Sequence, residues 1–230
     1  MTFSRFGRYE LLTVDIAAAR TFYTQVFGAD FWGTDFTLAN LPEPARARGA
    51  KPHFRGQLGV ADVEGTLQRF LADGSAQLGP PRHELNATRV GLKDPFGAIL
   101  TLTSEAMPPP RPLVAWHLMA TLDHPSAFAW YSALFGWKST GTVDLAEQGQ
   151  HQLFSWDDAG ATVGSISNIA RSPNIHTQWL FYFRVDDVER AAARVTELGG
   201  LALPALRGAD GAILTACDDA QGAAFGLYQA

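Results

Sequence analysis

Cysteine is nearly absent from this chain, with Cys217 the only one among 230 residues. A single cysteine excludes an intramolecular disulfide and any zinc site built from several cysteines. Cys217 ends the apolar run 212–217, and no activating base lies near it in the sequence. The sequence therefore predicts a buried structural thiol instead of a reactive nucleophile.

Charge and long apolar segments are also scarce. Charged residues make up 18% of the chain and the formal net charge is -5, so the sequence lacks the broad cationic surface that nucleic-acid binding requires. No apolar run approaches the roughly 20 residues that span a bilayer, and the first residues show no signal-peptide pattern. We expect no nucleic-acid partner, no membrane partner and a cytoplasmic location.

The sequence does contain an internal repeat. Asp15, Tyr23 and Gly28 recur as Asp123, Tyr131 and Gly136, at an offset of 108 positions (123 minus 15). Farther along, Asp62, Asp94 and Gly97 recur as Asp187, Asp219 and Gly222, at an offset of 125 (187 minus 62). The two halves are therefore homologous, and the second half has 17 extra residues (125 minus 108) between Gly136 and Asp187.

Each half contains a smaller repeat of its own. Four times, an apolar strand-like stretch is followed by an aspartate at a helix N-cap position and then by apolar residues at helical spacing. The four aspartates are Asp15, Asp62, Asp123 and Asp187. Short β-type runs follow the helices, at 31–38, 89–92, 99–103, 152–156, 212–216 and 224–228. The pattern predicts an α+β fold built from four βαβββ-like modules.

A proline-rich segment at 107–112 separates the halves, and it is unsuited to a regular helix or a central strand. We take it as a linker between an N-terminal domain at 1–106 and a C-terminal domain at 113–230. The modules are expected at about 6–50 and 53–105 in the first domain, and at about 113–170 and 176–230 in the second. Residues 42–52 are expected to form an exposed loop.

The combined motifs resemble those of the vicinal oxygen chelate superfamily, which includes glyoxalases, bleomycin resistance proteins and extradiol dioxygenases. The resemblance rests on 11–15 with Phe22-Tyr23 and Phe27-Gly28, on 119–123 with Trp130-Tyr131 and Phe135-Gly136, and on 183–187, 197–200 and 94–97. It implies two tandem glyoxalase-like domains. In each domain, a pair of modules would form a curved-sheet cup that is open to a small ligand.

The resemblance also implies where metal ligands would lie. Metal-dependent members carry His or Glu seven residues before the capping acid, and Glu seven residues after the Asp of the DPxG turn. Here these positions hold Arg8, Arg55, Trp116, Leu180, Thr101 and Gly226. None of these is a metal ligand, and a one-residue shift would add only His117. We therefore expect no cofactor, with a divalent metal only if this ligand alignment is wrong.

Side chains alternate along strands, so Arg8 and Glu10 share one face of their strand, and the resemblance implies that this face and its counterparts line the cups. For the first cup the candidate ligand-binding residues are Arg8, Glu10, Arg55, Gln57 and Thr101, and for the second cup Trp116, Tyr182 and Arg184, beside the core residue Leu118. Arg8 and Glu10 form either a binding pair or an ion pair at the rim. Glu10 and His117 are weak candidates for an acid or base, and His117 also fits a hydrogen-bonded core position. The remaining histidines show no ligand spacing, and most are expected in loops.

Three classes of function remain open at this point. The first is a bleomycin-resistance-like protein that binds a small organic molecule and has lost the usual metal site. The second is an enzyme of the lyase, isomerase or dioxygenase type with a non-standard or metal-free site. The third is a protein that keeps the fold to bind a partner, and the chain is expected to be a monomer or homodimer. The fold alone does not choose among them.

Overall fold

The structure is a computed structural model that describes residues 4–84, 87–108, 113–158, 160–208 and 211–230. Its first half contains β1 (Phe6–Thr13), α1 (Ile16–Phe27), the 3-10 helix η1 (Ala29–Phe31), β2 (Phe36–Asn40), α2 (Glu43–Arg46), β3 (His53–Gly59), α3 (Val63–Ala72), β4 (Ala76–Gln77), β5 (Arg82–Glu84), β6 (Ala87–Lys93) and β7 (Ile99–Thr103).

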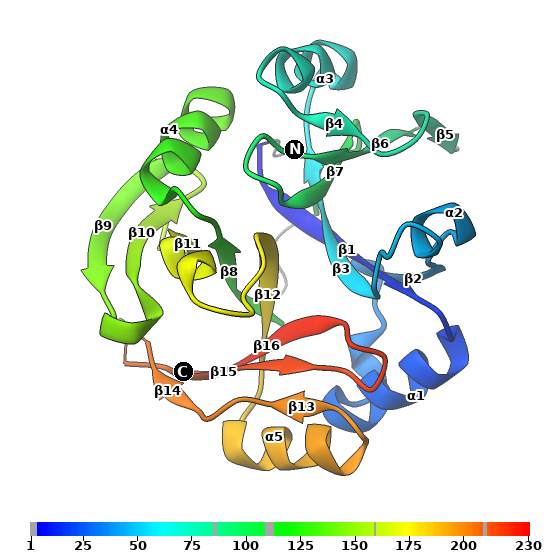
Figure 1. Ribbon diagram of the computed structural model, residues 1–230, viewed down its shortest axis with the longest axis vertical. Coiled ribbons are helices and arrows are strands. Elements are labelled where there is room, and N and C mark those ends of the chain that lie inside the picture. The colour runs from blue at the N-terminus through cyan, green and yellow to red at the C-terminus, as the bar shows by residue number, and fades with distance from the viewer. Residues whose placement is uncertain (1–3, 85–86, 109–112, 159, 209–210) are drawn as a thin grey trace. The chain divides into compact units, whose positions relative to one another are not determined.

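The second half repeats this series with additions (Figure 1). It contains β8 (Val114–Ala120), α4 (His124–Phe135), β9 (Lys138–Asp144), η2 (Ala146–Gln148), β10 (Gln150–Ser155), β11 (Gly164–Ser167), η3 (Asn168–Arg171), β12 (Gln178–Arg184), α5 (Val188–Glu197), β13 (Leu201–Ala202), β14 (Leu206–Arg207), β15 (Ile213–Asp218) and β16 (Ala224–Gln229).

The strand order confirms the homology of the two halves. One sheet has the order β2-β1-β3-β7-β6-β4, with β5 beside β6. The other has the order β11-β8-β12-β16-β15-β13, with β14 beside β15, and it continues past β11 to β10 and β9. Four parallel pairs recur at equivalent places, namely β1 with β2, β3 with β7, β8 with β11 and β12 with β16. The fold is α+β, and each curled sheet forms one cup of a tandem pair.

The four predicted helix caps are all present. The carboxylates of Asp15, Asp62, Asp123 and Asp187 each accept a hydrogen bond from the backbone N–H three residues later. This bond satisfies one of the N–H groups that lack a partner at the start of a helix. The caps fix where α1, α3, α4 and α5 begin.

The first module departs from the expected pattern. Within residues 28–52, all of which are described, only β2 forms, although three strands were expected after the helix. The run predicted at 31–38 divides into η1 and β2, and α2 interrupts the predicted loop at 42–52. Because β2 and β11 hold equivalent positions, the hairpin of β9 and β10 has no counterpart in the first module. The 17 extra residues belong to this hairpin region, and the first module is the shortened one.

The chain packs as two compact units, and each takes one module from each half. The first unit comprises the described residues of the ranges 1–8, 56–110 and 117–179. Its core includes Phe70 of α3, Tyr131 of α4 and Trp137, all fully buried. The Tyr131 hydroxyl donates to Asp94 Oδ2 over 2.6 Å, which ties α4 to the turn before β7.

The second unit comprises the described residues of the ranges 9–55, 111–116 and 180–230. Its core includes the fully buried rings of Phe183 and Phe225. The Tyr23 hydroxyl donates to Asp219 Oδ2 over 3.1 Å, which repeats in α1 and the turn before β16 the bond found in the other unit. Burial raises the pKa of Tyr23 well above its usual value, so the phenol remains a donor.

The structure can be compared with three further predictions, which concern Cys217, membrane-spanning helices and the linker. Cys217 is buried, and burial raises the pKa of its thiol to about 12, as expected for a structural thiol. No helix among the described residues is long and apolar enough to cross a membrane. Most of the linker predicted at 107–112 lies outside the described residues, and the domain bounds stay a prediction.

Candidate functional site in the first cup

Two buried polar side chains lie side by side on the inner face of the first sheet, within the first unit. Gln57 of β3 pairs directly with Thr101 of β7, so their side chains leave the same face. The opposite face carries Leu100 and Leu102, which are fully buried on the side of β7 that α3 contacts. The inner face of these two strands is therefore polar at its centre.

Neither of these two polar groups is satisfied. Gln57 is 6% exposed and Thr101 is 3% exposed. Gln57 Oε1 and Thr101 Oγ1 are both shielded from water, and neither has a hydrogen-bond partner among the described residues. An unsatisfied buried polar atom typically costs about 1–3 kcal/mol, so a pair of them is unusual in a folded domain. Both residues were sequence candidates for ligand binding.

An ion-pair cluster lies on the same sheet in the first unit. Glu105 Oε2 lies 3.8 Å from Arg8 Nε and accepts a bond from Arg89 Nη2, whose other nitrogen pairs with Glu84. Arg89 faces the same side as Gln57 and Thr101, because it pairs with Thr103 two residues along β7. Sequence reasoning selected Arg8 but missed Arg89 and Glu105, although Glu105 lies four residues after Thr101 and so continues its alternation along the chain.

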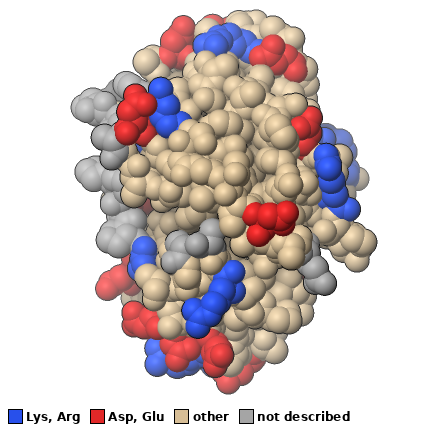
Figure 2. Space-filling view, turned by 90° about the vertical axis from the view of Figure 1, so that its left-hand side faces the viewer, with Lys and Arg blue, Asp and Glu red and all other residues tan. Residues whose placement is uncertain are grey.

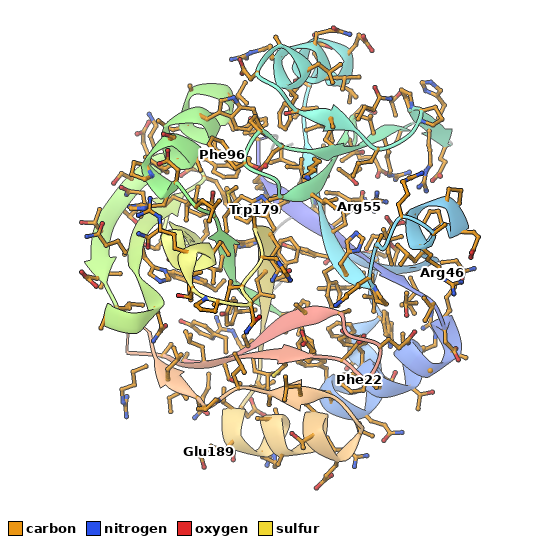
Figure 3. The ribbon with its side chains drawn as sticks, in the orientation of Figure 1. Phe22, Arg46, Arg55, Phe96, Trp179 and Glu189 are labelled. Atoms are coloured by element: carbon orange, nitrogen blue, oxygen red, sulfur yellow. The ribbon has the colours of Figure 1, made fainter. Side chains whose placement is uncertain are left out.

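Glu10 and Arg55 form an ion pair in the second unit. Nη2 of Arg55, which is labelled in Figure 3, donates to Glu10 Oε2, and the two side chains are 9% and 14% exposed. The carboxylate of Glu10 is therefore already engaged by a neighbouring cation, which weakens its candidacy as a general base. The Arg8–Glu10 pair considered from the sequence is replaced by two pairs with other partners, Arg8 with Glu105 and Glu10 with Arg55.

The equivalent of the Gln57–Thr101 pair in the second unit is Tyr182 of β12 with Gly226 of β16. Tyr182 is buried, and a Cβ atom built on Gly226 would lie only 2.2 Å from Tyr182 Cδ1. The tyrosine ring therefore lies directly on the backbone of β16. It fills the place where the resemblance puts a metal-binding carboxylate.

The other candidates of the second cup are dispersed. Arg184 is exposed, with its guanidinium carbon 5.3 Å from the centre of the Tyr228 ring. Trp116 is half-buried on β8 in the same unit. Of these, only Tyr182 is buried against the inner face of the sheet.

His117 occupies a core position in the first unit. Its Nδ1 donates to the carbonyl oxygen of Val163 over 2.9 Å, and its ring stacks on Phe6 at 5.8 Å. Burial lowers the pKa of His117 to about 4, so the imidazole is neutral at pH 7. The hydrogen-bonded core alternative for His117 therefore fits the structure better than a general base.

One polar pair was missed by sequence reasoning. His151, which lies in β10 and not in a loop, is buried with its Nδ1 3.0 Å from Ser165 Oγ of β11. Ser165 of β11 pairs with Leu118 of β8. Leu118 lies five residues before Asp123, the same spacing that separates Gln57 from Asp62. In each module, the residue five positions before the capping aspartate has a partner on the adjacent parallel strand. Examining that partner in every module would have identified Ser165.

The residues at the expected ligand positions do not fit a divalent cation. Arg8 and Arg55 bring positive charge, and Gly226 has no side chain. Throughout the part of the chain that the structure describes, no group of three or more His, Cys, Asp or Glu side chains is placed to hold a metal ion. Structural zinc takes four ligands and catalytic zinc commonly three protein ligands, which none of the described clusters offers.

Residues 114–227 match the family model described as the Glyoxalase/Bleomycin resistance protein/Dioxygenase superfamily. The chain belongs to this superfamily. Among curated proteins it is similar to "Putative glyoxylase CFP32" of Mycobacterium tuberculosis and of Mycobacterium bovis, with 28% identity in each case. Each match covers 83% of this chain and 81% of the mycobacterial protein.

Solved structures of the superfamily share this fold. Homoprotocatechuate 2,3-dioxygenase from Brevibacterium fuscum, in complex with 3,4-dihydroxyphenylacetate, matches with a TM-score of 0.66 and 14% identity, over 98% of this chain and 80% of that chain. The Mn(II)-bound glyoxalase from Novosphingobium aromaticivorans matches with a TM-score of 0.62 and 13% identity, over 99% and 82%. At these identities the likeness concerns the fold and does not transfer a substrate.

Proposed function

We propose that this superfamily member binds a small polar organic molecule on the inner face of its first cup, with Gln57 and Thr101 as the anchoring pair. The observation that carries the proposal is that both side chains are buried and that Gln57 Oε1 and Thr101 Oγ1 have no partner among the described residues. A ligand that bonded both atoms would recover the free energy that their burial costs. Binding sites typically have a few such placed polar groups.

The two atoms limit the chemistry of the ligand. Gln57 Oε1 is only an acceptor, so the ligand must offer an N–H or O–H group there. The hydroxyl of Thr101 can donate or accept. Arg8 and Arg89 both contact Glu105, and Arg89 also pairs with Glu84, so the charges of this cluster are balanced and the two anchoring atoms alone select the polar groups of the ligand.

A metal-free enzyme is the second candidate function, and the name of the mycobacterial relative is what favours it. The sequence candidates for an acid or base support it poorly, because Glu10 is paired with Arg55 and His117 is a neutral core residue. Binding without turnover requires neither group. On the face shown in Figure 2, acidic and basic side chains lie near one another and most of the surface is uncharged.

The binding proposal predicts that Thr101→Val weakens binding by roughly tenfold while leaving the protein folded. A thermal-shift screen of small hydroxy acids, carboxylates and phosphate esters would identify a binder, and calorimetric titration would compare the two proteins. Loss of one hydrogen bond to a polar ligand weakens affinity by roughly tenfold. If valine at position 101 leaves the affinity for a confirmed binder unchanged, Thr101 does not anchor the ligand.

The same substitution is expected to stabilise the ligand-free protein by about 1 kcal/mol, because it removes an unsatisfied buried hydroxyl at nearly constant shape. Thr215→Val is the matched control. Thr215 is also fully buried, but its hydroxyl donates to the Leu203 carbonyl oxygen over 2.6 Å, so valine there should destabilise the protein by a similar amount. Urea denaturation of the three proteins measures both effects. Equal destabilisation by both substitutions would show that Thr101 is satisfied in solution.

We also propose that the usual metal site has been lost, because Arg8 and Arg55 occupy two of the expected ligand positions. Tag-free protein is expected to contain well under one equivalent of transition metal by elemental analysis after mild chelation. Close to one equivalent of Zn, Ni, Mn or Fe per chain would overturn this part of the proposal.

A further inference from the structure

A row of cross-strand neighbours leads from the anchoring pair to the edge of the first sheet, within the first unit. Gln57 of β3 pairs with Thr101 of β7, and Thr101 pairs in turn with Gly91 of β6. The next residue of the row is Leu78, which follows β4 and whose backbone N–H donates to the Gly91 carbonyl oxygen over 2.8 Å. Residues directly opposite one another on neighbouring strands direct their side chains to the same face. Gly91 and Leu78 therefore share the inner face with the anchoring pair.

Exposure to solvent rises along this row. Gln57 and Thr101 are 6% and 3% exposed, Gly91 is half-buried, and Leu78 is 47% exposed. The inner face therefore reaches solvent at Leu78, and a molecule that approaches the two unsatisfied oxygens from this edge passes over Gly91. A single exposed leucine is ordinary on a protein surface, but this one lies in line with a buried polar pair that lacks partners among the described residues.

The backbone does not require glycine at position 91. Gly91 lies within β6 and its φ angle is not positive, so other residues could adopt the same conformation without strain. In the second unit the equivalent residue is Ala216, at the offset of 125 (216 minus 91), and it pairs with Gly226. Glycine inside a strand is less stable than alanine, and it often marks a place where another group approaches the backbone closely. A group that lies on the strand therefore explains Gly91 better than the fold does.

The charged neighbours of Gly91 on β6 are directed elsewhere. Arg89 is held by ion pairs with two glutamates. Lys93 extends toward the turn at 94–97, because its Cε lies 3.7 Å from the position that a Cβ on Gly97 would occupy. A neutral, apolar group therefore suits the surface of Gly91 better than a charged one.

The anchoring pair specifies the other end of the ligand. Gln57 Oε1 needs a hydrogen-bond donor, and the hydroxyl of Thr101 can itself donate. A carboxamide carries an N–H donor and a carbonyl acceptor side by side, so one such group can bond both side chains. A carboxylate offers no donor for Gln57 Oε1.

We propose that the first cup binds an uncharged carboxamide with an apolar substituent. The amide bonds Gln57 and Thr101, and the substituent lies on the backbone of Gly91 and extends toward Leu78. This inference rests on the function proposed above and names the class of its ligand. Leu78 lies two strands, or about 10 Å, from Thr101, so a substituent of several carbon atoms is needed to reach it. Gly91 determines specificity here, because a side chain at that position would occupy the place of the substituent.

Hexanamide is the probe, with acetamide and hexanoate as matched comparisons. Acetamide lacks the longer apolar substituent, and hexanoate lacks the N–H donor. Each buried methylene group strengthens binding roughly fourfold. NMR titration of wild type should therefore show hexanamide binding at least about tenfold more tightly than acetamide, and more tightly than hexanoate. The proposal is wrong if wild type does not bind hexanamide, or if either comparison binds as tightly.

Two substitutions test where the substituent lies. Gly91→Ala places a methyl group in its position and should weaken hexanamide binding by about tenfold or more. Leu78→Ala removes apolar surface and should weaken binding about threefold. The control is Leu71→Ala, because Leu71 is a 36% exposed leucine of α3, the helix that covers the opposite face of β7. This control should bind hexanamide as wild type does.

Ligand-free stability separates a blocked site from a damaged fold. Because glycine weakens a strand, Gly91→Ala should melt at the temperature of wild type or up to about 4 °C above it. Weaker binding together with a lower melting temperature would mean that Gly91 serves packing, and its assignment to the site would fail.

Thr101→Val distinguishes this inference from the function on which it rests. It should weaken hexanamide binding about tenfold, as Gly91→Ala does. If Thr101→Val weakens binding while Gly91→Ala and Leu78→Ala do not, the anchoring pair stands and the inference about the apolar substituent fails.

Discussion

Replacing Gly226 by alanine is expected to destabilise the protein by about 2 kcal/mol or more. The new Cβ would lie 2.2–2.5 Å from Cγ, Cδ1 and Cε1 of Tyr182, distances at which the ring must move. Tyr182 is buried, so its ring has little room. Restricting the unfolded chain favours alanine by about 0.4–1 kcal/mol, whereas overpacking a core costs about 1–3 kcal/mol and occasionally more. The clash is the larger contribution, so Gly226→Ala should lower the free energy of unfolding.

A double-mutant cycle measures this contact directly. Tyr182→Leu removes the ring atoms that meet the new Cβ, so Gly226→Ala should be less harmful in that background by roughly 1 kcal/mol or more. Gly160→Ala is the control, because Gly160 is exposed and its closest neighbour is a side-chain oxygen of Asp157 at 3.0 Å. It should change stability by less than about 0.5 kcal/mol. If the effects of Gly226→Ala and Tyr182→Leu are additive, the ring does not lie on β16 in solution.

The two cups differ in the pair of residues at the centre of the sheet. In the first cup, the central pair Gln57 and Thr101 is polar and unsatisfied, whereas in the second cup the equivalent pair is a tyrosine packed on a glycine. A ligand atom placed on Gly226 would have to displace a buried ring. The first cup is therefore the better candidate for binding, and the second contributes to the stability of its own unit.

The sequence predicted those features that depend on neighbouring residues. The capping bonds of Asp15, Asp62, Asp123 and Asp187 are made to the third residue onward, so a local pattern contains both partners. Strand alternation placed Arg55 and Gln57 on one face of their strand, because the period of two needs no tertiary information, and the resemblance to the superfamily added Thr101. The repeat offsets then indicated two homologous sheets.

Features that depend on distant partners escaped prediction. Arg8 contacts Glu105, and Tyr182 lies on Gly226, and neither pairing leaves a local signal in the sequence. The loss of a hairpin in the first module was also missed, because the apolar run at 31–38 fits η1 and β2 as well as it fits a strand. Apolar residues bury themselves in either structure, so their spacing did not distinguish the two.

The largest pH effect is expected from Asp94, and it should be visible in the difference between wild type and Asp94→Asn. Asp94 Oδ1 accepts bonds from the backbone N–H groups of Phe96 and Ala98, and Oδ2 accepts one from the Tyr131 hydroxyl. Burial nevertheless dominates and raises the pKa of Asp94 from 3.8 to about 6. The folded protein therefore binds a proton more readily than the unfolded chain does.

The direction of the pH effect on stability follows from the linkage between protonation and folding. The stabilising contribution of Asp94 is complete below its unfolded pKa of 3.8 and is lost as the pH rises through about 6. This difference in pKa corresponds to about 3 kcal/mol. His117 acts in the opposite direction, because its pKa falls from 6.5 to about 4, and its contribution is lost as the pH falls through that range. In wild type the two effects largely cancel between pH 4 and 6.

Asp94→Asn should therefore expose the opposing effect of His117. Asparagine retains an acceptor for the N–H groups of Phe96 and Ala98 but no longer titrates, so the variant should lose about 3 kcal/mol more stability than wild type between pH 7 and pH 4. His117→Phe retains a ring to stack on Phe6 and should show the reverse difference. Urea denaturation at pH 4, 5, 6 and 7 measures both slopes. Parallel pH profiles for wild type and Asp94→Asn would mean that Asp94 titrates alike in the folded and unfolded chain, and that its carboxyl is hydrated in solution.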